Sequence, residues 1–95
     1  MHHDSRGRML ATLAIYRSGL PHRDGPTRKA VAILLGVSHA QVSHYVTELW
    51  RLGLVDVSPW GMRAVTVTAD GRDEQIAAKA ISWATRTLKG NRNEA

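Results

Sequence analysis

A run of hydrogen-bonding side chains between Ser38 and Leu52 has the clearest potential for recognition chemistry in this sequence. Counted at 100° per residue around a helix from Val42, the positions that point most nearly away from the apolar side are small, polar or basic. Hydroxyl, imidazole and amide groups can bond to base edges or phosphates in the major groove of duplex DNA, and methyl groups can meet thymine methyls. The sequence therefore predicts DNA contacts from Ser38, His39, Ala40, Gln41, Ser43, His44, Thr47 and Arg51.

This face has a simpler alternative, because any amphipathic helix on a protein surface shows polar residues opposite its apolar stripe. Glu48 also fits DNA less well, since its carboxylate would repel phosphate. It would have to accept a hydrogen bond from a cytosine amino group or pair with Arg51. The helix alone does not decide between the two interpretations.

Basic residues outside this helix are further candidates for phosphate contact. Arg28 and Lys29 begin another predicted helix, whose N-terminal N–H groups also attract anions. Arg63 follows a turn containing Pro59 and Gly61, where its guanidinium would meet phosphate or the minor groove. For all three residues the alternative is an ordinary solvated side chain.

Other chemistry is poorly supported by the sequence. His39 and His44 are five residues apart and diverge around a helix, so they do not form the pair that chelates one metal ion. The chain has no cysteine. It shows no nucleophile-elbow motif, glycine-rich phosphate loop or paired carboxylates. We expect neither an enzyme nor a bound metal or cofactor.

The elements that position these residues follow from apolar periodicity and from turn residues. Helices are predicted over residues 5–17, from 26 or 27 to 35, and over 38–52, with Gly36 and Gly53 ending the second and third and Ser38 capping the third. Two strands, 54–57 and 64–68, flank a turn and form a hairpin. A last helix over 70–89 is expected to begin at a cap on Asp70, and residues 90–95 are expected to fray.

The faces expected to point inward follow from the same periodicity. They comprise Met9, Leu10, Leu13, Ala14 and Tyr16 in the first helix, Ala30, Val31, Leu34 and Leu35 in the second, and Val42, Tyr45, Val46 and Leu49 in the third. Ala32 is expected where the second and third helices cross. The fold class is therefore mainly α with a small β-hairpin, in the order helix, helix, helix, strand, strand, helix.

Composition fits one small globular domain over residues 1–95. Apolar residues make up 43% and charged residues 22%, which argues against a disordered or fibrous chain. The net charge of +5 raises the expectation of a polyanionic partner without identifying it. No apolar run approaches the length that spans a bilayer. We expect no membrane association, and the absence of cysteine fits a cytoplasmic protein.

Two helices joined only by Gly36-Val37 form a helix-turn-helix over residues 27–53, and the hairpin over 54–68 follows directly as a wing. With these elements the chain resembles winged-helix regulators of the multiple-antibiotic-resistance (MarR) and phenolic-acid (PadR) repressor type. The resemblance covers residues 27–72, and its most telling segments are Leu52-Gly53-Leu54-Val55 and Val67-Thr68-Ala69-Asp70-Gly71-Arg72.

The resemblance implies that the helix over 38–52 enters the major groove, that the wing contacts backbone or minor groove, and that two copies read a palindrome. The larger regulators have longer terminal helices, so no small-molecule ligand is expected here. The last helix has a broad apolar face, and the residues expected at a homodimer interface are Ile76, Ala80, Trp83 and Leu88.

The leading hypothesis is a small transcriptional regulator that binds double-stranded DNA sequence-specifically. One alternative is a winged-helix adaptor that binds another protein, whose expected sign is an exposed apolar face or use of Trp60 and Met62. Another is a plasmid, phage or viral DNA-binding protein for replication or packaging. No residue distinguishes that role from regulation, because the same DNA contacts serve both.

Overall fold

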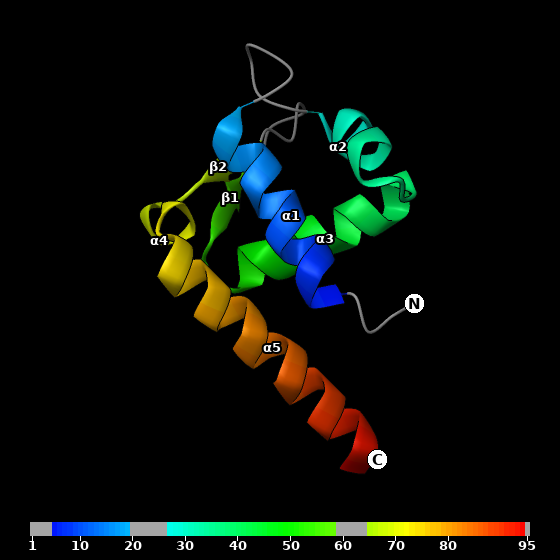
Figure 1. The fold of residues 1–95 in the computed structure, drawn as a ribbon, viewed down its shortest axis with the longest axis vertical. Coiled ribbons are helices and arrows are strands. Elements are labelled where there is room, and N and C mark those ends of the chain that lie inside the picture. Colours follow the sequence, from blue (N-terminus) through cyan, green and yellow to red (C-terminus); the bar gives the residue numbers. More distant parts are fainter. Residues whose placement is uncertain (1–4, 20–26, 59–64, 95) are drawn as a thin grey trace.

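The computed structural model describes residues 5–19, 27–58 and 65–94, and the side chains of these residues as far as 86. Within these ranges the order of elements is α1 (Ser5–Ser18), α2 (Arg28–Leu35), α3 (His39–Arg51), β1 (Val55–Val57), β2 (Val65–Val67), α4 (Ala69–Arg72) and α5 (Glu74–Glu94). Figure 1 shows α2 to the right of α1, the strands and α4 to its left, and α5 running below. The predicted class, mainly helical with a small antiparallel sheet, is confirmed.

The two strands pair antiparallel, with Val55 opposite Val67 and Val57 opposite Val65. Thr68 ties the base of this sheet to the end of α3. Its N–H donates to the Leu54 carbonyl over 3.1 Å, and its hydroxyl donates to the Gly53 carbonyl over 2.7 Å. The chain that leaves α3 and the chain that leaves β2 are therefore held together before α4 begins.

The core lies where the apolar faces of α1, α3 and α5 meet each other and the sheet. Its fully buried large side chains include Leu13, Leu49, Leu54 and Ile81. The inward stripe predicted for α3 is confirmed, because all four of its members are buried: Val42, Tyr45, Val46 and Leu49. Burial of these side chains is the main force that fixes α3 against the rest of the chain.

The inward faces predicted for α1 and α2 are wrong at two positions. Ala14 is exposed, and Leu34 keeps 58% of its surface in contact with solvent. The eight-residue α2 contacts α1 and α3, and its buried face is centred on Val31 and Ala32. At 100° per residue this turns Leu34 outward. Ala32 is buried where it was expected, at the side facing these two helices.

The predicted single helix over 70–89 is also wrong, because the chain forms a short α4 and then α5. Thr68, not Asp70, caps α4 by accepting from the Gly71 N–H over 3.1 Å. Asp73 then leaves the helical conformation at φ −85° and ψ 110°. Its carboxylate accepts from the N–H groups of Gln75 and Ile76, which starts α5. The helix continues to Glu94, past the predicted end and through the residues expected to fray.

The short α4 packs tightly on the base of the sheet at Gly71, which is buried. A Cβ at this position would overlap the Leu54 carbonyl oxygen and lie 2.8 Å from Cγ1 of Val67. Arg17 at the end of α1 fixes the same turn from the other side. Its Nη2 and Nε donate to the Gly71 carbonyl over 2.9 and 3.1 Å.

No helix in the described ranges is both long enough and apolar enough to cross a membrane.

Candidate nucleic-acid interface

The turn between α2 and α3 is built on Gly36. Thr27 caps α2, and Gly36 ends it in the left-handed conformation at φ 69°, which glycine adopts without steric cost. The N–H of Val37 then donates to the Ala32 carbonyl over 3.0 Å. The predicted role of Gly36 as the terminator of this helix is confirmed, and the turn leaves only Val37 before the cap of α3.

A complete capping box begins α3. The Ser38 hydroxyl accepts from the Gln41 N–H over 3.1 Å, and the Gln41 side-chain oxygen accepts from the Ser38 N–H over 3.2 Å. Both residues were predicted to contact DNA, and both are exposed. Their side chains also stabilise the helix that would present the other contacts, so a substitution here affects two properties at once.

The outward face of α3 lies opposite its buried stripe, as predicted. Ala40, His44, Thr47 and Arg51 are exposed, and Ser43 at the edge of the face is half-buried. His39 in the first turn is exposed as well. The centroids of the His44 and Tyr45 rings are 6.0 Å apart, and the two rings are tilted by 56°. These side chains offer hydroxyl, imidazole, methyl and guanidinium groups on one surface.

Two of these residues have partners within α3. Arg51 lies 3.4 Å from the Glu48 carboxylate, which is the pairing that the sequence offered as one way to reconcile Glu48 with DNA. The Thr47 hydroxyl donates to the Ser43 carbonyl over 2.9 Å, which leaves the Thr47 methyl group for apolar contact. The ion pair is solvent-exposed at Arg51, so it is worth about 0 to 1 kcal/mol and would be displaced readily by phosphate.

The predicted phosphate contacts differ in their surroundings. Lys29 is exposed in the first turn of α2. Arg28 is half-buried, and its positive charge acts on the Tyr16 phenol of α1. Burial raises the pKa of Tyr16 above 10.0, and the Arg28 charge opposes that rise. Arg63, Trp60 and Met62 lie outside the described residues.

Apart from Glu48 on α3 and Asp56 on β1, the described acidic residues lie away from this surface. Neither α2 nor α3 has an acidic residue in its first turn. Asp70, Asp73 and Glu74 lie at the junction of α4 and α5, which Figure 1 places on the opposite side of the molecule from the turn between α2 and α3. The N-terminal ends of both helices therefore offer their partial positive charge to an anion without a carboxylate beside it.

The chain matches no protein-family model, no curated protein and no solved structure. The chemistry of its own residues is therefore the basis for assigning a function.

Three large apolar side chains on α2 and α3 were not predicted to be exposed. Ile33 and Leu34 on α2 are 72% and 58% exposed, and Trp50 near the end of α3 is 53% exposed. Trp50 lies 80° around the helix from Val42, so a wider angular count would have placed it at the edge of the outward face. The exposure of Ile33 and Leu34 depends on which side of the short α2 contacts α1 and α3, and the apolar pattern of the sequence does not show that side.

The residues predicted for a dimer interface lie along α5. Ile76 and Trp83 are 45% and 58% exposed, while Ala80 between them is half-buried. Leu88 belongs to the same helix, but its side chain is not described. Among the described residues, no group of three or more His, Asp or Glu side chains is placed to hold a metal ion.

Proposed function

We propose that this protein is a small winged helix-turn-helix regulator, of the MarR and PadR type, that binds double-stranded DNA sequence-specifically. In this proposal α3 enters the major groove and its outward face contacts base edges. The strands β1 and β2 form the base of a wing that contacts backbone or minor groove. A cytoplasmic location belongs to the same proposal.

The observation that carries the proposal is the way α2 holds α3. The turn at Gly36 and the capping box at Ser38 fix the start of α3, and its buried stripe packs into the core. The opposite face is left exposed along the helix at Ala40, His44 and Thr47. A rigid helix with one face free is what recognition in a groove needs, because base contacts depend on accurate placement of a few side chains.

Electrostatics supports the same orientation. Lys29 and Arg51 are exposed at the two ends of the α2–α3 unit. Contacts from such residues to phosphates would position the helix without reading sequence, and His44 and Ser43 would supply the discrimination. Arg63 as a phosphate contact from the wing remains part of the proposal.

A homodimer is proposed because a two-fold arrangement lets two recognition helices read two half-sites. The exposed apolar candidates for its interface are Ile76 on α5 and Ile33 and Leu34 on α2. Direct measurement of mass in solution tests this part separately from DNA binding.

The test begins with selection of duplexes from a randomised pool by the purified protein. Fluorescence anisotropy then compares the enriched duplex with a scrambled duplex at low and near-physiological salt. We expect a preference of about 10³ or more for the enriched duplex. The logarithm of the affinity should fall with the logarithm of salt concentration, with a slope of about −0.9 per phosphate neutralised. Sequence-blind binding that salt abolishes would contradict the proposal.

A protein-interaction adaptor is the second candidate, and the exposed apolar residues favour it. Ile33 and Leu34 expose more apolar surface than a short solvated helix needs, and Trp50 adds an aromatic side chain of the kind that anchors protein interfaces. The distinguishing result would be no duplex preference, combined with a stoichiometric protein partner that survives nuclease treatment. That partner should be lost in the double variant Ile33→Ser, Leu34→Ser.

A further inference from the structure

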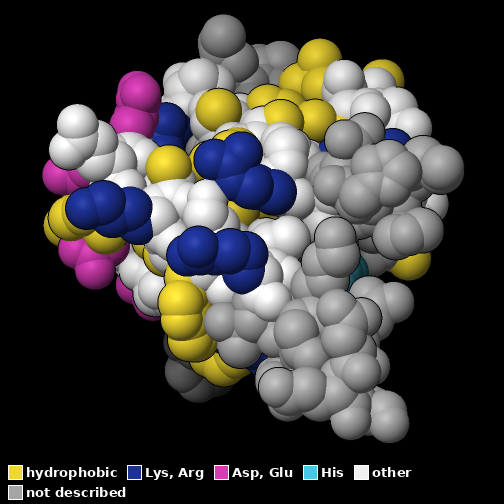
Figure 2. Space-filling view, turned by 60° about the horizontal axis from the view of Figure 1, so that its bottom comes forward, with side chains coloured by type: hydrophobic (Ala, Val, Ile, Leu, Met, Phe, Trp, Pro, Cys, Tyr) yellow, Lys and Arg dark blue, Asp and Glu magenta, His cyan; other side chains and the backbone are white. Residues whose placement is uncertain are grey.

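A second surface, separate from the outward face of α3, lies where the N-terminal end of α1 meets the middle of α5. It is an open groove of about 560 Å³, and its lining contains no acidic residue: Arg6, Ala78, Lys79, Ser82, Trp83 and Arg86. Three of these six side chains are cationic. Figure 2 shows Lys and Arg side chains gathered on the face that contains α5, with the Asp and Glu side chains at its left edge.

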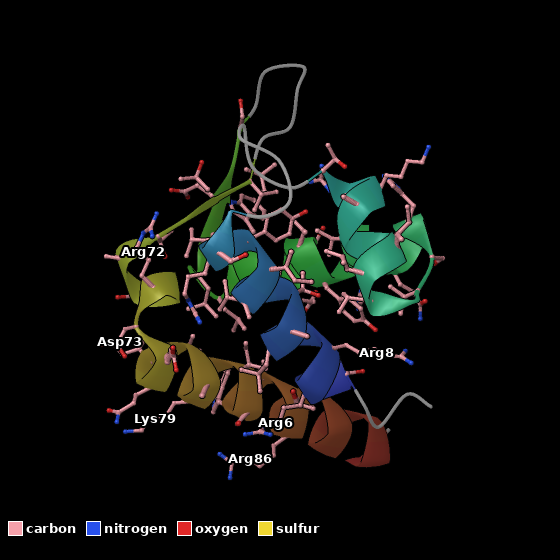
Figure 3. All side chains as sticks on the ribbon, turned by 45° about the horizontal axis from the view of Figure 1, so that its top comes forward. Arg6, Arg8, Arg72, Asp73, Lys79 and Arg86 are labelled. Carbon is pink, nitrogen blue, oxygen red and sulfur yellow. The ribbon has the colours of Figure 1, made fainter. Side chains whose placement is uncertain are left out.

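The cations of this groove come from two helices. Arg6 from α1 reaches across to α5, where its Nε donates to the Ser82 hydroxyl over 2.7 Å. That bond fixes the guanidinium at the level of Ser82 and does not use its terminal amino groups. Lys79 and Arg86 are two turns apart on α5, about 10 Å along the axis at 1.5 Å per residue. Figure 3 shows all three side chains projecting from the same side of the α1–α5 pair.

Trp83 adds a flat apolar surface to this charged groove. Its side chain is 58% exposed, although an indole gains more than most side chains from burial. Phosphate contacts alone would not need an aromatic ring at this position. A cation-lined groove that contains an exposed aromatic ring is the arrangement by which proteins hold single-stranded nucleic acid, with phosphates along the cations and bases stacked on the ring.

We propose that the groove between α1 and α5 binds a single strand of nucleic acid independently of α3. Arg6, Lys79 and Arg86 contact successive parts of its phosphate backbone, and one base stacks on Trp83. Binding is insensitive to base sequence, because every base offers a face for stacking. The protein would thus combine a duplex-reading helix with a site for an unpaired strand.

Charge complementarity favours this occupant over a second copy of the chain. Lys79 and Arg86 flank Trp83, so a symmetric pairing of two α5 helices around it would bring cations against cations. The described carboxylates at the start of α5, Asp73 and Glu74, have partners outside the groove. Asp73 caps the helix, and Glu74 lies 3.9 Å from Arg17.

The test uses the full chain and fluorescein-labelled oligothymidylate of about 12 nucleotides, within the usual site sizes of about 4 to 16. Anisotropy titrations compare the wild type with Trp83→Ala, Trp83→Phe and Arg86→Gln. Arg72→Gln is the matched control, because it removes the same charge from an exposed arginine that ends α4 and does not line the groove, and Figure 3 shows it apart from Arg6, Lys79 and Arg86. Circular dichroism confirms that each variant is folded at the temperature of the titration.

We expect Trp83→Ala to weaken oligothymidylate binding about five- to a hundredfold, and Trp83→Phe to retain most of the affinity. Arg86→Gln should weaken binding and reduce the salt slope by about 0.7, while Arg72→Gln leaves both unchanged. The double variant Ser43→Ala, His44→Ala should bind oligothymidylate normally, and Arg86→Gln should keep its duplex preference. With these two variants, an error in the proposal for the groove can be distinguished from an error in the proposal for α3.

Three results would overturn the proposal. The first is oligothymidylate binding that Trp83→Ala does not change. The second is an equal loss in Arg86→Gln and Arg72→Gln, which would reduce the effect to net charge. The third is co-sedimentation with phosphatidylserine vesicles that depends on Trp83 and that oligothymidylate does not compete away, since the occupant would then be an anionic lipid surface.

Discussion

The backbone carbonyl of Leu54 occupies the space that a side chain at Gly71 would need. Leu54 follows the end of α3, and Gly71 lies in α4 after the sheet, so this approach joins α3 to the last two helices. The Gly71 carbonyl on the other side accepts two hydrogen bonds from Arg17. A single glycine thus lies between the exit of α3 and the end of α1.

Gly71→Ala should destabilise the protein by about 1 to 3 kcal/mol or more, because the added methyl group overlaps backbone and cannot be relieved by a side-chain rotation. Gly7→Ala is the matched control. Nothing lies within 4 Å of a Cβ at Gly7, and alanine favours its helix, so that variant should be neutral or slightly stabilised. Urea unfolding of both variants measures the difference. Equal stabilities would refute the close approach at Gly71.

Arg17→Met should lower stability by about 1 to 3 kcal/mol, because it removes both charge-assisted hydrogen bonds to the Gly71 carbonyl while keeping an apolar stem. Glu74→Gln should cost much less. Its ion pair with Arg17 spans 3.9 Å, and the Glu74 side chain is 83% exposed. Thermal unfolding of the two variants compares the stability that each contact provides. A larger loss of stability in Glu74→Gln than in Arg17→Met would contradict the greater weight given to the hydrogen bonds with Gly71.

Two substitutions in the capping box allow the stability of the protein and its affinity for duplex DNA to be tested separately. Ser38→Ala should destabilise the protein by about 0.5 to 2 kcal/mol. Gln41→Glu should keep its Tm, because glutamate also completes a capping box and suits a helix N-terminus. The same substitution should weaken duplex binding, since it adds a negative charge at the start of α3. Calorimetry and anisotropy on one preparation check both effects. Undiminished duplex affinity would argue against DNA at this end of α3.

Tyr16 links stability to alkaline pH. Burial raises the pKa of its phenol above 10.0 in the folded state, against the opposing charge of Arg28. The contribution of the neutral Tyr16 phenol to the free energy of unfolding is therefore fully present below pH 10.0. It is lost as the pH rises through the higher folded-state pKa.

In that range the stability of the wild type should fall relative to Tyr16→Phe by up to about 1.4 kcal/mol per pH unit. The Tyr16 hydroxyl has no hydrogen-bond partner among the described residues, so Tyr16→Phe should cost little at pH near 8. Urea unfolding of both proteins across this range gives the difference directly. Parallel pH profiles would show that Tyr16 ionises equally in the folded and unfolded chains.

Local signals in the sequence were sufficient for the turn between α2 and α3 and for the faces of α3. Gly36 ends a helix because it tolerates a positive φ, and Ser38 begins one because its hydroxyl accepts from the first turn. The inward stripe of α3 follows from a period of 3.6 residues. These features depend on neighbours within a few residues, so the outward face that contains His44 and Thr47 was predicted correctly.

The features that were missed depend on contacts between distant segments. Thr68, Asp70 and Asp73 are all residue types that cap helices, and the chain uses Thr68 for α4 and Asp73 for α5, where Gly71 packs against Leu54. Leu34 turned outward because α2 contacts its neighbours through Val31 and Ala32. The groove at Trp83 requires Arg6 from the other end of the chain, which no local pattern brings to α5.

The central claim is that the exposed face of α3 reads DNA sequence, and the most direct test is the discrimination ratio of the double variant Ser43→Ala, His44→Ala. Anisotropy titrations measure its affinity for the enriched duplex and for the scrambled duplex beside those of the wild type. We predict that the ratio falls by about tenfold or more, while the affinity for scrambled DNA changes little, because phosphate contacts remain. A ratio equal to that of the wild type would contradict the assignment of α3 as the recognition helix.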